Sequence, residues 1–245
     1  MCEDVTTDRF LNDRIEVLQY RNGYRFSIDA ALLAAFAAPG DDSRIVDLGT
    51  GCGIIPLILG YRYPGVYIVG VEIQAALAAL AMRNAKINGF GDRIAIRCLD
   101  INALTIQDVA GPVELVVSNP PYRKAMSGRV NPKHQQAVAR HEILTTLPDV
   151  VNAATRLLGI GGRFAVIYPA ERISDLLTAM RAADIEPKQL QMVHSRMQSP
   201  ARRILVSGVK GGRSGGAAVL PPLIIYAADG AYTGAVAAML RPEGG

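Results

Sequence analysis

The chain has 245 residues, of which 50% are hydrophobic and 20% are charged, so it can bury a large core and does not belong to the disordered class. Its apolar runs are shorter than the about 20 residues that cross a bilayer. Its three cysteines, Cys2, Cys52 and Cys98, predict neither a disulfide framework nor a metal site, which favours a soluble cytoplasmic protein. The formal net charge of +4 permits a nucleic-acid partner without requiring one.

The first forty residues predict a hairpin followed by a helix. Asn22-Gly23 stands between two β-like runs in IEVLQYRNGYRFSID, which is a hairpin signal. Asp29 can cap a helix that continues to Ala38. We therefore expect residues 1–40 to form an N-terminal hairpin and helix, and residues 41–245 to form a catalytic domain that is one compact unit.

From position 44, short β-rich runs alternate with helical patterns, as in βαβ units. The runs RIVDLG, VYIVGVE, IAIRCLD and ELVVSN predict strands, and 74–88 predicts a helix that ends before Gly89. Further on, 144–158 is amphipathic, RFAVIYP is a strand-like run, and 174–183 is helical. These elements predict a doubly wound α/β fold, with a parallel sheet and helices on both faces.

After Pro187 the alternation of β-rich runs with long helical patterns ends. The runs QLQMVHS, RILVSGV and PLIIYAA are β-like and are separated by loops, which predicts antiparallel edge strands. The glycine-rich stretch GVKGGRSGGAAV predicts a mobile loop.

A glycine-rich turn follows the first strand of the βαβ region. Gly49, Gly51 and Gly53 allow a sharp turn and let a ligand approach the backbone NH groups. Their spacing, G-x-G-x-G after Asp47, differs from the dinucleotide fingerprint and from the phosphate loop. Because Asp47 would repel a pyrophosphate and attract a cation, the turn favours S-adenosylmethionine, which carries an ammonium and a sulfonium.

Two more acids end the next two predicted strands, at the sheet edge where such folds bind ligands. We expect Glu72 to accept hydrogen bonds from the cofactor's ribose hydroxyls and Asp100 to accept one from its adenine amine. Ile73 and Ile101 should pack on the adenine ring. The alternative is a turn with three solvent-facing acids that bind nothing.

The fourth strand ends in Ser118-Asn119-Pro120-Pro121-Tyr122. The two prolines stiffen the backbone and remove NH donors, so that carbonyl oxygens remain as acceptors. Asn119 and the Pro120 carbonyl could accept both hydrogens of a planar amine and turn its lone pair toward the methyl group of the cofactor. Because the amine must then lie beside that methyl group, we also expect Asn119 to contact the cofactor. Tyr122 could stack on a flipped base. Taken alone, the segment is more typical of a stiffened turn, but its place at the ligand-binding edge favours a catalytic role.

The segment RKAMSGRVNPKHQQAVARH comes directly after Tyr122 and contains no acid. Its basic residues predict phosphate contacts, although a solvated loop face is the alternative. The predicted RNA-binding residues are Arg123, Lys124, Arg129, Lys133 and Arg140.

The combination of DLGTGCG, VGVE, CLD and SNPPY resembles the class I, seven-stranded S-adenosylmethionine-dependent N-methyltransferases. In that class the N-P-P-Y loop is the site at which planar amines or amides are methylated. The chain is also similar to the bacterial valine-tRNA adenine N6-methyltransferases over nearly its whole length, from GYRFSIDAALLAAF to GGRFAVIYPAER. The resemblance implies S-adenosylmethionine as cofactor, the N6 amine of an adenine in RNA, first of all tRNA, as substrate, and an N-terminal segment around 26–29 that lies over the cofactor.

Three alternatives stay open. Glutamine methyltransferases of translation release factors and guanine-N2 methyltransferases of ribosomal RNA share the N-P-P-Y loop. A noncatalytic RNA-binding module would use only the basic loops, but the acceptor segment and all three acids are intact. The oligomeric state is not predicted.

Overall fold

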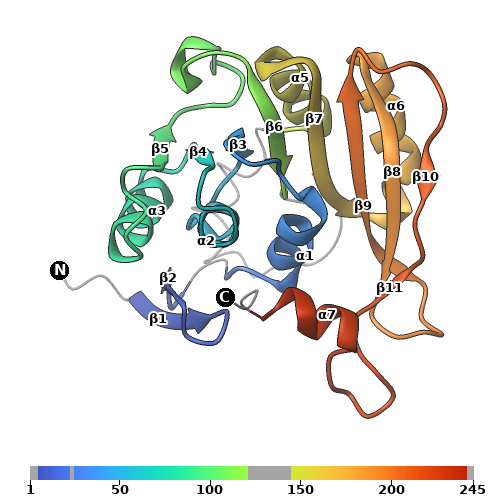
Figure 1. Cartoon of the computed structure of the whole chain (residues 1–245), viewed down its shortest axis with the longest axis horizontal. Coiled ribbons are helices and arrows are strands. Elements are labelled where there is room, and N and C mark those ends of the chain that lie inside the picture. Colours follow the sequence, from blue (N-terminus) through green and yellow to red (C-terminus); the bar gives the residue numbers. More distant parts are fainter. Residues whose placement is uncertain (1–4, 23–24, 121–144, 242–245) are drawn as a thin grey trace, which may run out of the picture.

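The computed structural model describes residues 5–22, 25–120 and 145–241, and its centre is a β-sheet with helices on both faces (Figure 1). Across the sheet the long strands follow the order β5-β4-β3-β6-β7-β9-β8, and only β9 runs antiparallel to its neighbours. This confirms the predicted α/β fold. The long strands are β3 (Arg44–Leu48), β4 (Tyr67–Glu72), β5 (Ile94–Cys98), β6 (Val113–Ser118), β7 (Leu158–Pro169), β8 (Ile185–His194) and β9 (Ala201–Lys210).

The predicted antiparallel pairing is confirmed where β9 lies between β7 and β8, but the outermost strands of the sheet differ from it. Two short strands, β10 (Ala218–Val219) and β11 (Leu223–Ile224), both pair with β8 in parallel. The glycine-rich stretch before them is held against β8, because Gly215 donates its NH to Glu186 Oε1 at 2.8 Å and Lys188 Nζ donates to the Gly215 carbonyl at 2.6 Å. The stretch that was expected to be a mobile loop is therefore a connection that hydrogen bonds hold against β8.

Two hydrophobic cores form because the central strands bury side chains on both faces. Ile45 and Leu115 pack with the helices on one face, whereas Val46 and Phe164 pack with those on the other. The first face carries α1 (Ile28–Ala37), α2 (Ile54–Arg62), α3 (Ala75–Ile87) and the short α7 (Gly234–Met239). The second carries α5 (Leu147–Leu157), α6 (Ile173–Ala182) and the 3-10 helix η1 (Gln107–Val109), and a second 3-10 helix, η2 (Ala170–Arg172), joins β7 to α6. Among the described residues, no helix is long and apolar enough to cross a membrane.

The N-terminal hairpin is present, but its turn is not where the sequence predicted it. β1 (Val5–Phe10) pairs with β2 (Ile15–Tyr20), and the chain turns through Leu11, Asn12 and Asp13, all at positive φ. Asn22 follows the second strand, and Gly23 lies outside the described residues. Asn and Asp tolerate the left-handed conformation, so Asn12-Asp13 was the turn signal that the Asn-Gly pair obscured.

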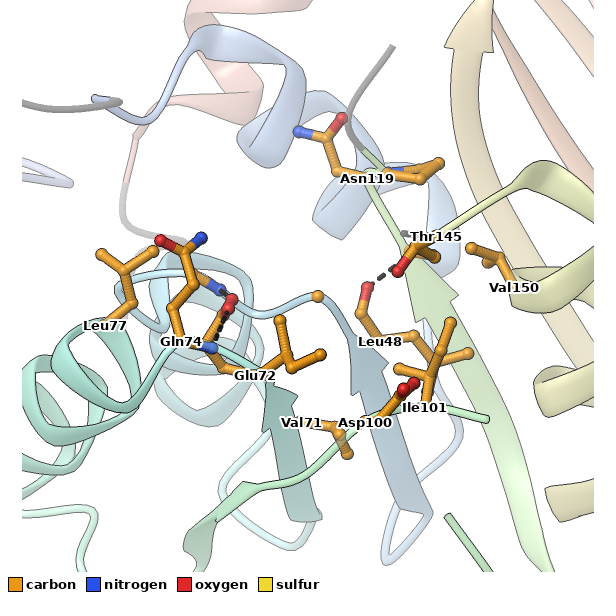
Figure 2. A pocket seen from close by; sticks show the side chains of 15 residues that line it. Leu48, Val71, Glu72, Gln74, Leu77, Asp100, Ile101, Asn119, Thr145 and Val150 are labelled. Carbon is orange, nitrogen blue, oxygen red and sulfur yellow. Dashed lines mark hydrogen bonds between the residues drawn. The ribbon is translucent and has the colours of Figure 1, made fainter. Parts of the chain in front are cut away.

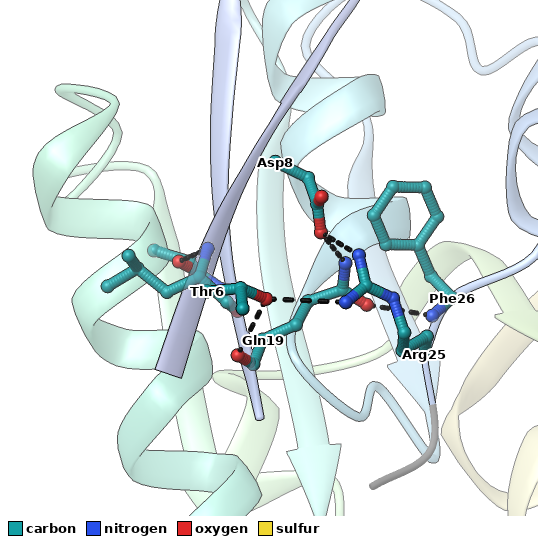
Figure 3. Close-up of polar contacts among 7 residues, drawn as sticks. Thr6, Asp8, Gln19, Arg25 and Phe26 are labelled. Atoms are coloured by element: carbon teal, nitrogen blue, oxygen red, sulfur yellow. Dashed lines mark hydrogen bonds and ion pairs between the residues drawn. The ribbon is translucent and has the colours of Figure 1, made fainter. Parts of the chain in front are cut away.

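The entry into α1 is fixed by a polar network on the hairpin (Figure 3). Gln19 is buried and accepts a hydrogen bond from the Phe26 NH at 2.9 Å while its amide donates to Asp8. Arg25 pairs with the same Asp8 carboxylate. The cap of α1 is then Ser27, whose hydroxyl accepts from the Asp29 NH, and not Asp29 as predicted.

Asn84 of α3 and Asn88, which caps the carboxyl end of that helix, close the free edge of β2. Asn84 Oδ1 accepts from the Leu18 NH at 2.8 Å and its Nδ2 donates to the Leu18 carbonyl at 3.0 Å. Asn88 makes the same pair of bonds with Glu16, at 2.9 and 2.7 Å. Four residues along a helix rise about 6 Å, and two residues along a strand rise about 6.6 Å. The two asparagines therefore match the spacing of Glu16 and Leu18, and their amides make the hydrogen bonds that a neighbouring strand would make.

Candidate active site

The glycine turn after β3 is bound to the neighbouring strand β4. Gly49 and Thr50 both donate their NH groups to the Val71 carbonyl, at 2.9 and 3.0 Å. Gly49 and Gly51 have φ of +76° and +58°, and a Cβ on either would meet no atom within 4 Å, so these two glycines are required by backbone conformation and leave open space beside the turn. Gly53, at φ +85°, precedes α2 and lies against α3.

Asp47 lies beneath this turn and not at the sheet edge as expected. Its side chain is 0% exposed, and neither carboxylate oxygen has a hydrogen-bond partner within 3.5 Å. Burial raises the pKa of Asp47 to about 7, which the nearby Thr50 hydroxyl partly offsets and the Glu72 carboxylate reinforces. A buried acid without a partner indicates a site that is completed by a positive charge.

Glu72 ends β4 and connects the turn to the next helix. It is 6% exposed, its Oε2 accepts from the Gly51 NH at 3.0 Å, and its Oε1 accepts from the Gln74 NH at 2.9 Å. Each carboxylate oxygen has a second lone pair, so Glu72 can hold the turn and still accept bonds from a ligand.

Asp100 follows β5, and its carboxylate is bonded to the loop that comes directly after it. Its Oδ1 accepts from the Asn102 NH at 2.8 Å, which fixes the side chain where it lines the same pocket as Glu72. Ile73 and Ile101 supply apolar surface to this pocket. The arrangement offers carboxylate acceptors next to two aliphatic side chains, as the sequence predicted.

The acceptor segment begins where β6 ends. Ser118 is fully buried and donates its hydroxyl to the Leu48 carbonyl at 2.8 Å, so the end of β6 is tied to the start of the glycine turn. Asn119 and Pro120 come next and line the pocket. The other predicted catalytic and RNA-binding residues lie outside the described residues: Pro121, Tyr122, Arg123, Lys124, Arg129, Lys133 and Arg140.

A single pocket collects most of the predicted site residues that the structure describes (Figure 2). Asn119 lies on one side of it, and Gln74 and Leu77 from the α3 side lie across from it. Asp47 and Gly53 are not among the lining residues. The predicted residues that line the pocket are Gly49, Gly51, Glu72, Ile73, Asp100, Ile101, Asn119 and Pro120.

Comparison with known proteins identifies the family. Residues 27–180 match the model of the methyltransferase small domain. The chain belongs to the methyltransferase small-domain family. It is also 33% identical over 205 residues to a tRNA1(Val) (adenine(37)-N6)-methyltransferase of Porphyromonas gingivalis, covering 81% of this chain and 80% of that protein. A protein of the same name from Dickeya chrysanthemi is 33% identical, with 85% and 81% covered.

Solved structures agree with the methyltransferase fold. A predicted O-methyltransferase from Agrobacterium tumefaciens superposes with a TM-score of 0.70 at 22% identity and covers 86% of this chain and 94% of its own. A geranyl diphosphate methyltransferase in complex with SAM has a TM-score of 0.53 at 16% identity, with 74% and 84% covered. The family confirms the predicted methyltransferase, and the fold is shared with a protein that was solved with S-adenosylmethionine bound.

The residues of this methyltransferase fit that cofactor. The unpartnered Asp47 carboxylate lies under a turn whose open glycines would admit a ligand. Glu72 and Asp100 line the adjacent pocket between aliphatic side chains. The part of the chain that the structure describes holds no cluster of three metal-ligating side chains.

Several pocket and support residues of this methyltransferase were missed by sequence reasoning. Gln74, Leu77, Thr145 and Val150 line the pocket, and no local sequence signal marks them. Gly70 could have been found, because a glycine inside a strand suggests close approach: a Cβ there would lie 2.8 Å from Ile96 and 2.9 Å from the Thr50 hydroxyl.

Proposed function

We propose that this protein transfers the methyl group of S-adenosylmethionine to the exocyclic N6 amine of an adenine in tRNA. The observation that carries the proposal is the placement of Asn119 and Pro120 in the pocket that also contains Glu72 and Asp100. The relatives named tRNA1(Val) (adenine(37)-N6)-methyltransferase match most of the chain, which supports adenine in tRNA as the substrate.

The cofactor would be held by the residues that end the first three parallel strands. Glu72 would accept bonds from the ribose hydroxyls, and Asp100 from the adenine amine, with Ile73 and Ile101 on the ring. The Asp47 carboxylate, beneath the turn, would attract the ammonium and sulfonium of the cofactor. When bound, S-adenosylmethionine supplies an electrophilic methyl group on a sulfonium that departs as a neutral thioether.

The substrate amine would be oriented by acceptors from the end of β6. An aromatic amine is a poor nucleophile because its lone pair is delocalised into the ring. Asn119 Oδ1 and the Pro120 carbonyl would accept its two hydrogens and direct the lone pair toward the methyl group. The nitrogen–carbon bond forms as the carbon–sulfur bond breaks, and the amine loses one proton to solvent, so orientation contributes more than a strong base.

The N-terminal segment would help to form the cofactor site. Residues 26–29 do not line the pocket, but the hairpin is bonded to Asn84, whose Nδ2 also donates to the Cys52 carbonyl of the glycine turn at 2.8 Å. This contact supports a role for residues 1–40 in holding the turn from behind. The basic residues between Arg123 and Arg140, and a cytoplasmic location, stay predictions from the sequence.

The purified protein should be incubated with labelled S-adenosylmethionine and, separately, bulk tRNA, ribosomal RNA and release factors. Label should enter tRNA and appear as N6-methyladenosine after nuclease digestion. Label in ribosomal guanine or in a release-factor glutamine would replace the proposed substrate by one of the two alternatives. No transfer to any of the three would contradict an enzymatic role at this site.

A further inference from the structure

A second surface lies at the same edge of the sheet as the acceptor segment. In register, Ser118 of β6 is level with Val166 of β7, Val206 of β9 and Leu190 of β8. Beyond that row β6 continues into Asn119, and β8 continues into the connection 195–200. Three strand spacings of about 4.8 Å separate β6 from β8, and the connection begins about 13 Å farther along the strand direction than Asn119, so it lies about 20 Å from the acceptor segment.

The β8–β9 connection and the segment after β11 lie side by side there (Figure 1), and residues of both line one pocket. The Ile225 and Tyr226 NH groups donate to the carbonyls of His194 and Ser195, both at 2.9 Å. His194 Nδ1 donates to the Ser199 carbonyl at 2.7 Å across the base of the connection. The backbone of this surface is therefore fixed by hydrogen bonds before any ligand binds.

The surface presents aromatic and flexible apolar side chains to solvent. Tyr226 and Tyr232 stack with ring centroids 5.4 Å apart at 16°, and Tyr232 remains 44% exposed. Met197, at the tip of the β8–β9 connection, is 73% exposed. A tyrosine that is stacked on one side and open on the other provides a fixed platform for a further planar ring.

The surface carries arginines, and one acid, Asp229, lies in the turn between Tyr226 and Tyr232. Arg196 and Arg202 are exposed at this edge, and among the described residues neither pairs with an acidic side chain. Arg196 reaches across the pocket and donates to the Ala227 carbonyl at 3.4 Å. No Asp or Glu lines the pocket. Guanidinium groups without an acidic partner, on a surface that also exposes an aromatic ring, are a combination that binds single-stranded nucleic acid.

We propose that this tyrosine–arginine surface, consisting of Arg196, Met197, Arg202, Tyr226 and Tyr232, binds the single-stranded RNA next to the target adenine. The proposal rests on the proposed function, because its ligand is the same tRNA. Tyr232 stacks with an unpaired base, and the two arginines contact phosphates. A span of about 20 Å corresponds to a few nucleotides, so one RNA strand can reach both this surface and the acceptor segment.

The test compares tRNA affinity over a range of salt concentrations for the wild type and for variants of these exposed residues. Arg196→Ala and Arg202→Ala should each reduce the salt slope by about 0.7, the value for one phosphate contact on a single strand. Tyr232→Ala should weaken binding about 5- to 150-fold, the range that 1 to 3 kcal/mol of base stacking implies. Tyr232→Phe keeps the ring and should bind as the wild type does.

Arg213→Ala is the matched control. Arg213 is exposed and lies past the carboxyl end of β9, at the opposite edge of the sheet, so its loss removes the same charge and should leave the salt slope unchanged. Affinity for S-adenosylhomocysteine and the thermal midpoint should not change in any of these variants. The kcat at saturating tRNA should also be retained, with the loss confined to KM.

The outcomes separate this inference from the proposed function. A wild type that methylates tRNA, together with Tyr232→Ala and arginine variants that bind it equally well, would overturn the surface and leave the function intact. A wild type that neither binds nor methylates tRNA would overturn both. A dimer in sedimentation that Tyr232→Ala converts to monomer would show that the surface is an interface between copies of this chain, which would also overturn the inference.

Discussion

Asn119 is the residue on which the proposed chemistry depends most. We expect Asn119→Ala to keep its affinity for S-adenosylhomocysteine and to lose about 10²- to 10³-fold in the rate of methyl transfer, because aligning the amine acts mainly in the transition state. Single-turnover methylation measures this loss. Asn152→Ala, at an exposed position on α5, is the control. Equal rates in both variants would contradict the role of Asn119.

The buried Asp47 predicts how stability changes with pH. Its pKa of about 7 in the folded state lies above the ordinary value of 3.8, so between these values the folded protein holds a proton that the unfolded chain has lost. The free energy of unfolding should therefore fall as pH rises from about 4 to about 7. Urea unfolding should show this fall in the wild type and a smaller one in Asp47→Asn.

The same residue couples cofactor binding to pH. A cationic ligand favours the ionised carboxylate, so below pH 7 binding must first release the proton of Asp47, and affinity for S-adenosylmethionine should weaken as pH decreases. Calorimetric titration in buffers of different ionisation enthalpy detects that proton release. Asp47→Asn should bind more weakly and without proton release; an Asp47→Asn profile that matches the wild type would assign the pH dependence to another group.

For single residues, the sequence predicted most of the side chains that line the pocket, but it did not predict which carboxylate is buried. Strand-end position was enough for Glu72 and Asp100, because parallel strands bring their carboxyl ends to one edge. It failed for Asp47, which shares a face of β3 with the core residue Ile45 and lies one residue before the end of the strand. Only the packing of Thr50 against Gly70 shows that this carboxylate is enclosed.

At the scale of elements, Asn84 and Asn88 form a natural pair for testing how the hairpin supports the turn. Both close the edge of β2, but only Asn84 also donates to Cys52 in the glycine turn. We expect Asn84→Ala to cost about 1 to 3 kcal/mol of stability, because Asn84 is buried, and Asn88→Ala to cost about 0.5 to 1.5 kcal/mol, because its bonds with Glu16 are exposed. Only Asn84→Ala should lower affinity for S-adenosylhomocysteine, by about tenfold, the equivalent of one hydrogen bond.

Chemical unfolding and calorimetry measure the two quantities separately. Equal losses of cofactor affinity in both asparagine variants would mean that the hairpin acts only through overall stability. This contact was beyond sequence reasoning, because it joins residues 52 and 84 with residue 18 through a side chain that looks like an ordinary polar residue on a helix. The hairpin itself was predicted, although its turn was placed at Asn22-Gly23 and not at 11–14.

At the scale of the whole molecule, alternating hydrophobic runs and glycine turns were sufficient to predict the parallel sheet and its helices. The orientation of the last strands was not predictable from composition. β10 and β11 are two residues each, and they are placed by bonds from β8 and by the tether at Gly215, which local patterns do not encode. That edge also brings Tyr232 and Arg196 to the side of the sheet where the acceptor segment begins.

Nucleoside mass spectrometry of tRNA tests the central claim most directly. tRNA from cells that lack this protein should be missing N6-methyladenosine at one position. Expression of the wild type should restore the modification, and Asn119→Ala, expressed at the same level, should not. A tRNA population with unchanged N6-methyladenosine in the absence of the protein, or full restoration by Asn119→Ala, would contradict the account.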